Sequence, residues 1–129
     1  MNAIRRWASV GMLCGMAMSA ATAGALDECV VKGDHAAVSR CLLDADREAQ
    51  ASLNAAEAAA GTRARELDTV TGRPRANAAL ARSMRAFAEY RKMQCEFIKA
   101  MYASGSGADQ GMLACRIDLT RRRLRDLQP

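Results

Sequence analysis

Four of the five cysteines of this short chain, all of them beyond its N-terminal segment, constrain the fold more than any other feature of the sequence. They are Cys29, Cys41, Cys95 and Cys115. An even number of cysteines in a small exported domain is typical of a disulfide framework, and three pairings are formally possible. We favour Cys29–Cys41 and Cys95–Cys115, because each cysteine then joins its nearest partner in the sequence. Closing loops of this size stabilises a small domain by about 3 kcal/mol each.

A metal site is the alternative use of these cysteines. Zinc ligands usually come in close pairs such as C-x2-C, and no two of the four cysteines are that near to each other. His35 is the single histidine of the chain and has no second histidine to act with it. We therefore expect disulfide bonds, with no metal and no cofactor.

The N-terminal segment has the organisation of a secretory signal peptide. Arg5 and Arg6 provide its positive region, and residues 7–21 carry no charge but are too short for a comfortable membrane span. Small residues then satisfy the A-x-A cleavage rule twice, which allows a cut after Ala23 or after Ala25. The second cut is preferred here.

Cleavage after Ala25 divides the chain into a signal peptide, residues 1–25, and one helical domain, residues 26–129. Cys14 is removed with the signal peptide, and the remaining 104 of 129 residues suffice for one core but not for two. We expect the mature protein in the periplasm or outside the cell, with no integral membrane span.

The charge and the aromatic residues argue against a nucleic-acid binder. Two of the 19 basic residues lie in the signal peptide, so 17 remain against 14 acidic ones, a mild net charge of +3. The mature aromatic residues all fall in one segment, whereas single-strand binding needs stacking side chains interleaved with basic ones. A protein partner is the better expectation.

The mature sequence predicts an all-α fold, because no run of alternating β-branched residues is long enough for a convincing strand. A first helix starts after Asp34, its N-cap, and continues toward Leu67 with apolar or small residues every three or four positions. The sequence Thr-Gly-Arg-Pro at residues 71–74 ends it, since glycine commonly ends helices and proline disfavours helix in the residue before it.

A second helix begins near Arg75 and ends at the glycine-rich break of residues 104–108. Its apolar face is expected to carry most of the core. The residues on that face are Leu80, Met84, Phe87, Arg91, Cys95, Ile98 and Met101 or Tyr102. A third helix runs from Gln110 to about Leu127, with Asp109 as its cap. The predicted fold is a small, disulfide-stapled, antiparallel bundle of about three helices.

Two blocks of the sequence resemble a known family. The stronger block reads Ser83-x-Arg85-Ala86-Phe87-x-x-Tyr90-Arg91-x-x-x-Cys95, then Ser104-Gly105-Ser106, then Cys115-x-x-x-Leu119-Thr120-x-x-Arg123-x-x-Asp126-Leu127. The weaker block runs from Cys29 through Cys41 to Leu53-Asn54. In order and spacing these blocks resemble the LprI-like lysozyme inhibitors over nearly the whole mature chain.

The resemblance implies a non-enzymatic, exported protein that binds and blocks a lysozyme or a related muramidase. The candidate contact residues lie in the loop before the third helix, where small polar side chains next to a disulfide are suited to entering a cleft. They are Ser104, Gly105, Ser106 and Asp109. Many lysozymes are basic, so the net charge of +3 does not steer association.

The other motif residues have structural interpretations. Phe87, Tyr90 and Arg91 are more readily assigned to helix packing than to partner binding. Thr120 can bond back to the preceding helical turn, and Arg123 lies on the same face, so both are suited to fixing the contact between the second and third helices. The sequence contains no nucleophile motif and no phosphate-binding loop, which also argues against an enzyme.

Two other functions remain open. One is a structural or assembly role in the cell envelope, in which the bundle docks onto another exported protein. The weaker one is binding to the envelope surface through the basic C-terminal helix, which moderate salt would abolish.

Overall fold

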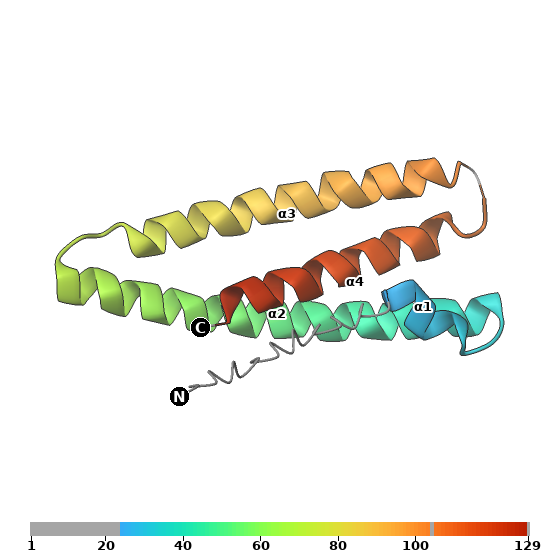
Figure 1. The fold of residues 1–129 in the computed structure, drawn as a ribbon, viewed down its shortest axis with the longest axis horizontal. Coiled ribbons are helices and arrows are strands. Elements are labelled where there is room, and N and C mark those ends of the chain that lie inside the picture. The colour runs from blue at the N-terminus through green and yellow to red at the C-terminus, as the bar shows by residue number, and fades with distance from the viewer. Residues whose placement is uncertain (1–23, 104, 129) are drawn as a thin grey trace, which may run out of the picture.

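The fold is a bundle of four helices in a computed structural model that describes residues 24–103 and 105–128. The helices are α1 (Ala25–Val30), α2 (His35–Thr71), α3 (Ala76–Met101) and α4 (Ala108–Leu127). The two long helices α2 and α3 form an antiparallel hairpin, α4 returns along both, and α1 packs against α2 and α4 (Figure 1). The predicted all-α, disulfide-stapled bundle is confirmed, with one helix more than expected.

Most of the predicted signal peptide, residues 1–23, lies outside the described part of the chain. Among the described residues, no helix is both long and apolar enough to cross a membrane.

Helix α2 begins and ends through local chemistry that the sequence predicts. The Asp34 carboxylate accepts the backbone N–H of Ala37 at 2.9 Å, which caps the first turn. Gly72 ends the helix in the left-handed conformation at φ 63°, which glycine adopts without steric cost. Gly61 does not interrupt the helix. It is buried on the side that faces Leu80 of α3.

Helix α1 is the element that the sequence did not predict. It has six residues, too few for a hydrophobic period to be recognised, and its N-cap Gly24 offers no capping side chain. The cap comes from α4 instead, because the Asp118 carboxylate accepts the N–H of Ala25 at 2.9 Å. The Cys29–Cys41 disulfide then fixes α1 to α2, with 5.7 Å between the two Cα atoms.

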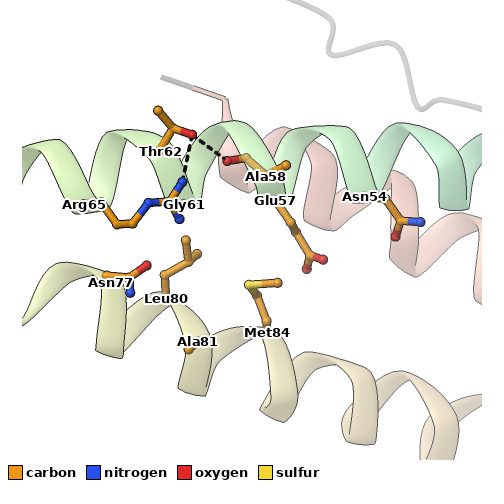
Figure 2. Close-up of a pocket in the computed structure, with 10 residues that line it drawn as sticks. All are labelled: Asn54, Glu57, Ala58, Gly61, Thr62, Arg65, Asn77, Leu80, Ala81 and Met84. Atoms are coloured by element: carbon orange, nitrogen blue, oxygen red, sulfur yellow. Dashed lines mark hydrogen bonds between the residues drawn. The ribbon is translucent and has the colours of Figure 1, made fainter.

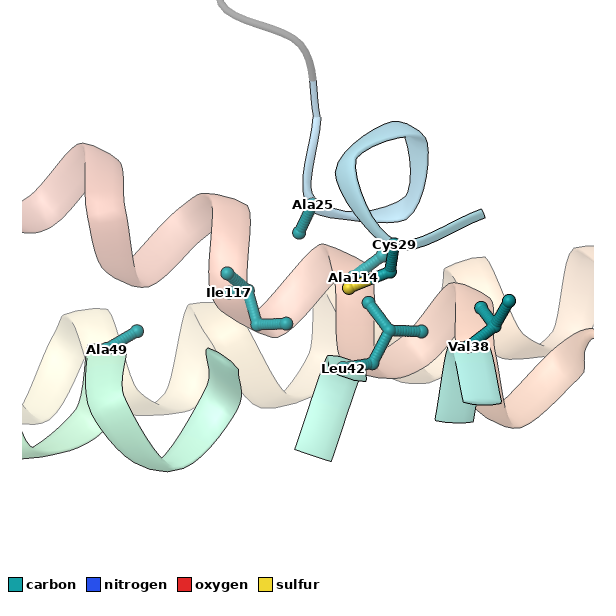
Figure 3. Close-up of a cluster of buried hydrophobic side chains, with 7 residues drawn as sticks. All are labelled: Ala25, Cys29, Val38, Leu42, Ala49, Ala114 and Ile117. Atoms are coloured by element: carbon teal, nitrogen blue, oxygen red, sulfur yellow. The ribbon is translucent and has the colours of Figure 1, made fainter. Parts of the chain in front are cut away.

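The main core lies where α1, α2 and α4 meet (Figure 3). Its buried members are Ala25, Cys29, Val38, Leu42, Ala49, Ala114 and Ile117. The expectation that the second long helix carries most of the core is wrong, since Cys95 is the one buried residue of α3. Amphipathicity shows which side of a helix faces its neighbours but not how many neighbours cover it. Helix α3 has two neighbours, and most of its inward residues remain half-buried.

The bundle has two unequal ends because α4 is shorter than the hairpin beside it. Helix α4 ends at Leu127, whose carbonyl accepts a hydrogen bond from Arg63 of α2 at 3.0 Å. Beyond this point α2 and α3 face each other alone, and we call residues 64–82 the tip. No residue of the tip is buried. We call the rest, residues 24–56 and 87–128 as far as they are described, the stapled end, because both disulfides lie in it.

Candidate functional site

The α3–α4 loop, where the sequence placed the contact residues, lies beside the α1–α2 turn at one extremity of the stapled end (Figure 1). We call this surface the loop end. Its described residues are 31–35, 102, 103 and 105–107. Ser104 lies outside the described residues, whereas Gly105 and Ser106 are exposed.

The loop has an internal framework of backbone hydrogen bonds. Gly105 donates to the carbonyl of Tyr102 at 3.0 Å, and Ala108 donates to the carbonyl of Gly105 at 3.1 Å. Ala103 takes the left-handed conformation at φ 50°, which turns the chain away from α3. These bonds satisfy backbone groups that a flexible connection would leave to water.

Side chains from α2 and α4 fasten the loop to the bundle. The Nε2–H of His35 donates to the carbonyl of Ser106 at 3.0 Å. Gln110 of α4 donates both to the carbonyl of His35 and to the hydroxyl of Ser39, each at 3.0 Å. His35 and Gln110 therefore support the loop from behind. The sequence held no signal for either role, since both bonds join residues more than 70 positions apart.

Tyr102 packs its ring against two glycines of α4 and its N-terminal turn. A Cβ atom at Gly111 would lie only 2.5 Å from the Tyr102 ring, closer than any real contact. At Gly107 the corresponding distance is 3.5 Å, an ordinary van der Waals contact. Gly111 is therefore required for the close packing that sets the position of the loop relative to α4.

A disulfide and an ion pair lie at the base of the loop. Cys95 of α3 is bonded to Cys115 of α4, with 5.6 Å between their Cα atoms, and this is the pairing that nearest-neighbour spacing favours. Lys99 and Asp109 form an exposed ion pair at 2.7 Å. Asp109, a predicted contact residue, is thus already partnered within the protein. The prediction that it caps the helix is wrong, because α4 begins at Ala108, its N-cap is Gly107, and Asp109 lies inside the first turn.

Apolar side chains surround this small polar loop. Val31 in the α1–α2 turn is 78% exposed, and Phe97 and Met101 are exposed along the last turns of α3. Tyr90 and Met93 extend the same exposed stripe along α3. Exposed apolar side chains that gather beside a polar loop are typical of protein interaction sites.

Four of the other motif residues, Phe87, Arg91, Thr120 and Arg123, form a cluster that joins α3 to α4, whereas Tyr90 is exposed outside it. The guanidinium groups of Arg91 and Arg123 lie 5.4 and 5.6 Å from the centre of the Phe87 ring, within cation–π range. Arg91 also donates to the hydroxyl of Thr120 at 2.6 Å, and Arg123 donates to that of Ser83 at 2.9 Å. Thr120 is buried and binds Arg91 across the helix interface, in place of the bond to its own preceding turn that the sequence suggested.

The electrostatics of this cluster also fit a structural role. Burial of its guanidinium, together with the neighbouring charge of Arg116, lowers the pKa of Arg91. Asp46 and Glu57 oppose that effect, and Asp46 is in turn paired with Arg116 at 2.9 Å. The acidic side chains of α2 thus partly offset the arginine charges that α3 and α4 bring to this cluster.

A separate cavity of about 540 Å³ opens between α2 and α3 at the border of the tip (Figure 2). Glu57 and Arg65 of α2 face Leu80 and Met84 of α3 across it. The described residues contain no group of three or more histidine, cysteine or acidic side chains that could hold a metal ion.

Comparison with known proteins gives one match. The family model described as "Lysozyme inhibitor LprI" matches residues 29–127, which is most of the chain and includes all four cysteines of the two disulfides. No curated protein and no solved structure matches the chain.

Proposed function

The chain belongs to the family of the lysozyme inhibitor LprI, and on that premise we propose that it binds a lysozyme or related muramidase and blocks the cleft with its loop end. The protein acts as a non-enzymatic inhibitor in the periplasm or outside the cell, after removal of the N-terminal signal peptide. Besides the family, the observation that carries this proposal is that the loop end is exposed and held in place by a disulfide and a hydrogen bond.

The loop end has the properties expected of a segment that inserts into an enzyme cleft. Gly105 and Ser106 are small and exposed, so the backbone can approach the floor of a cleft closely. The Cys95–Cys115 disulfide and the His35 hydrogen bond hold the loop in place before binding, which reduces the entropy lost on association. The exposed apolar residues beside the loop, Val31, Phe97 and Met101, supply apolar area of the kind that dominates binding energy in interfaces.

The charges at the loop end balance one another. Lys32 and Asp34 carry opposite charges there, and Lys99 and Asp109 form an ion pair at the base of the loop. A basic lysozyme therefore meets a locally neutral surface on a domain of mild positive charge. Affinity must then come from shape and apolar contact, and long-range attraction contributes little.

The first experiment is a lytic assay with purified, oxidised mature protein. It is titrated against chicken-type, goose-type and invertebrate-type lysozymes on a cell-wall substrate, beside a reduced and alkylated sample. We expect stoichiometric loss of lysis with the oxidised sample alone. Absence of inhibition by micromolar protein against every class would refute the proposal.

A matched pair of variants tests the surface. Val31 at the loop end is 78% exposed, and Val70 at the opposite extremity is 86% exposed. Val31→Asp places a charge in the proposed interface and should weaken inhibition by about tenfold or more. Val70→Asp should leave inhibition unchanged. Equal inhibition by both variants would exclude the loop end as the contact surface.

The alternative is an assembly role in the cell envelope, and the exposed apolar stripe on α3 favours it. In that case the protein would not reduce lysozyme activity at any concentration. It would capture another exported protein, and Met93→Asp would abolish that capture. A lytic assay without inhibition, together with such a capture, would replace inhibition by assembly as the function.

A further inference from the structure

The beginning of α1 bears on where the signal peptide is removed. The sequence allows cleavage after Ala23 or after Ala25, and the A-x-A rule does not distinguish them. Ala25 is 0% exposed and belongs to the main core, where it packs in one cluster with Cys29 and Leu42 (Figure 3). A cut after Ala25 would remove this core residue.

The same cut would remove both backbone contacts that start α1. The N–H of Ala25 donates to the Asp118 carboxylate at 2.9 Å, and this bond is the tie between the start of α1 and α4. The carbonyl of Gly24 accepts the N–H of Glu28 at 3.1 Å, the first hydrogen bond of the helix. The remaining helix keeps the Cys29–Cys41 disulfide and the Glu28–Arg121 ion pair, but it loses its cap and its first hydrogen bond.

We propose that signal peptidase cleaves after Ala23, that the mature protein begins at Gly24, and that Asp118 binds the newly formed α-amino group. In this step water hydrolyses the amide bond between Ala23 and Gly24. Ala23 keeps the new carboxylate on the departing signal peptide. The nitrogen of Gly24 becomes an amine and takes up a proton at neutral pH, since its ordinary pKa is about 7.7–8.0.

The surroundings of Gly24 suit a positive charge. An atom in the Cβ position of Gly24 would lie 3.1 Å from Oδ2 of Asp118 and 3.9 Å from Oδ2 of Asp27. Oδ1 of Asp118 is occupied by the Ala25 N–H, so Oδ2 remains to accept from the ammonium group. The nearby Glu28 is already paired with Arg121 at 2.8 Å, and Arg122 lines the groove beside Asp118. The terminal ammonium therefore adds a cation where two carboxylates converge.

Folding then makes the second cleavage site inaccessible to a protease. The bond between Ala25 and Leu26 lies inside α1, with Ala25 buried beneath it, whereas Gly24 is extended and precedes the helix. A protease that needs an extended segment cannot cleave the bond between Ala25 and Leu26 once α1 has docked. The mature protein should accordingly have a single N-terminus.

The direct test is the mass of the exported protein. The full chain is expressed with its own N-terminal segment in a secreting host, and the mature form is analysed by intact mass and N-terminal sequencing. We expect the chain Gly24–Pro129 with both disulfides formed. A mature chain that begins at Leu26 would overturn the proposal.

A second test measures what the two residues contribute. Oxidised chains that begin at Gly24 and at Leu26 are melted side by side. The shorter chain loses a buried methyl group, a cap and a hydrogen bond, so its Tm should be lower by about 5–10 °C. Equal Tm values would show that Ala25 is dispensable to the fold and would remove the structural basis of the proposal.

A third test addresses the ammonium group itself. In the Gly24 chain labelled at its first residue, the α-amino pKa is followed by NMR. Pairing with Asp118 should raise this pKa above 7.7–8.0, and Asp118→Asn should lower it again, while the control Asp126→Asn should not. The stabilisation is then present below the unfolded pKa and lost as pH rises through the folded one. An identical pKa in all three proteins would refute the pairing.

Discussion

The stapled end and the tip are made from the same two long helices, yet different forces hold them together. In the stapled end α4 and α1 cover the helices, two disulfides cross-link them, and the buried core lies there. In the tip no residue is buried, and exposed apolar side chains such as Leu67 and Val70 point to solvent. The comparison teaches that a helix can be continuous while its stability is concentrated at one end.

The tip is organised by local polar contacts in place of a core. The Asp68 carboxylate accepts the N–H groups of Arg75, Ala76 and Asn77 at 3.1, 2.8 and 3.0 Å. These are the free donors of the first turn of α3, so one side chain at the end of α2 caps the next helix. The hydrogen bonds to these N–H groups, that to Asn77 first, lower the pKa of Asp68.

The proposed inhibitory surface lies at the stapled end, where the helices are covered and cross-linked. An inhibitory loop binds well when its base does not move, and the loop end has a disulfide and a hydrogen-bonded histidine behind it. The turn of the tip is held by the hydrogen bonds to Asp68, and both disulfides lie outside it. Matched substitutions at the two ends can test whether this division is real.

The largest difference is expected for two leucines of α2. Leu42 is 0% exposed and Leu67 is 55% exposed. Leu42→Ala should lower the free energy of unfolding by about 2–5 kcal/mol, because it leaves a cavity in the core. Leu67→Ala should change it by less than about 0.5 kcal/mol. Urea unfolding followed by circular dichroism measures both, and comparable losses would mean that the tip contributes as much as the core.

The next difference concerns the disulfides. Replacing Cys95 and Cys115 together by serine should cost about 3 kcal/mol, since it releases the unfolded chain from a closed loop. The same double change at Cys29 and Cys41 should cost about as much and should also free α1. Thermal unfolding of the two variants beside the parent protein is the measurement. A loss below about 1 kcal/mol would show that packing alone holds the stapled end.

A smaller effect is expected from two threonines. Thr120→Val removes the acceptor of Arg91 from a buried position and should destabilise by about 1–2 kcal/mol. Thr69→Val at the exposed tip, where the hydroxyl bonds only to the carbonyl of Arg65, should stay within about 0.5 kcal/mol. Chemical denaturation measures the free energy of unfolding of both variants. A larger loss for Thr69→Val than for Thr120→Val would contradict the comparison.

The smallest effect concerns Asp68 and depends on pH. Its pKa is lowered in the folded state, so its contribution is present above the unfolded pKa of about 3.9 and is lost as pH falls through the folded pKa. Asp68→Ala should reduce hydrogen-exchange protection in the first turn of α3 near pH 6 but not below the folded pKa. Asp126→Ala, on the exposed side of α4, is the control and should change nothing at the tip. Unaltered protection in Asp68→Ala at pH 6 would disprove the cap.

Several features of the fold followed directly from the sequence. The Asp34 cap, the stop near Gly72 and the glycine-rich break before α4 are local signals, and local signals are readable because they involve residues within one turn. The cysteine pairing favoured by proximity is the one observed. The LprI resemblance also rested on sequence order alone, and the family match bears it out.

The candidate site was only partly predictable. The sequence indicated the α3–α4 loop, but His35 and Gln110, which support it, gave no signal because their partners are more than 70 residues away. Gly111 could not be recognised as a packing residue until Tyr102 was seen against it. Contacts of this kind depend on how helices are placed, and no local pattern encodes that placement.

The sequence by itself thus determined the helical class, the ends of the long helices, the disulfide framework and the family. Tertiary structure alone decided that α1 exists, that the core lies between α1, α2 and α4, and that α3 is left half-covered. The physical reason is that caps and turns act over a few residues, whereas burial depends on which surfaces meet across the whole chain. The N–H of Ala25 shows this most directly, since its cap, Asp118, lies 93 residues further along the chain.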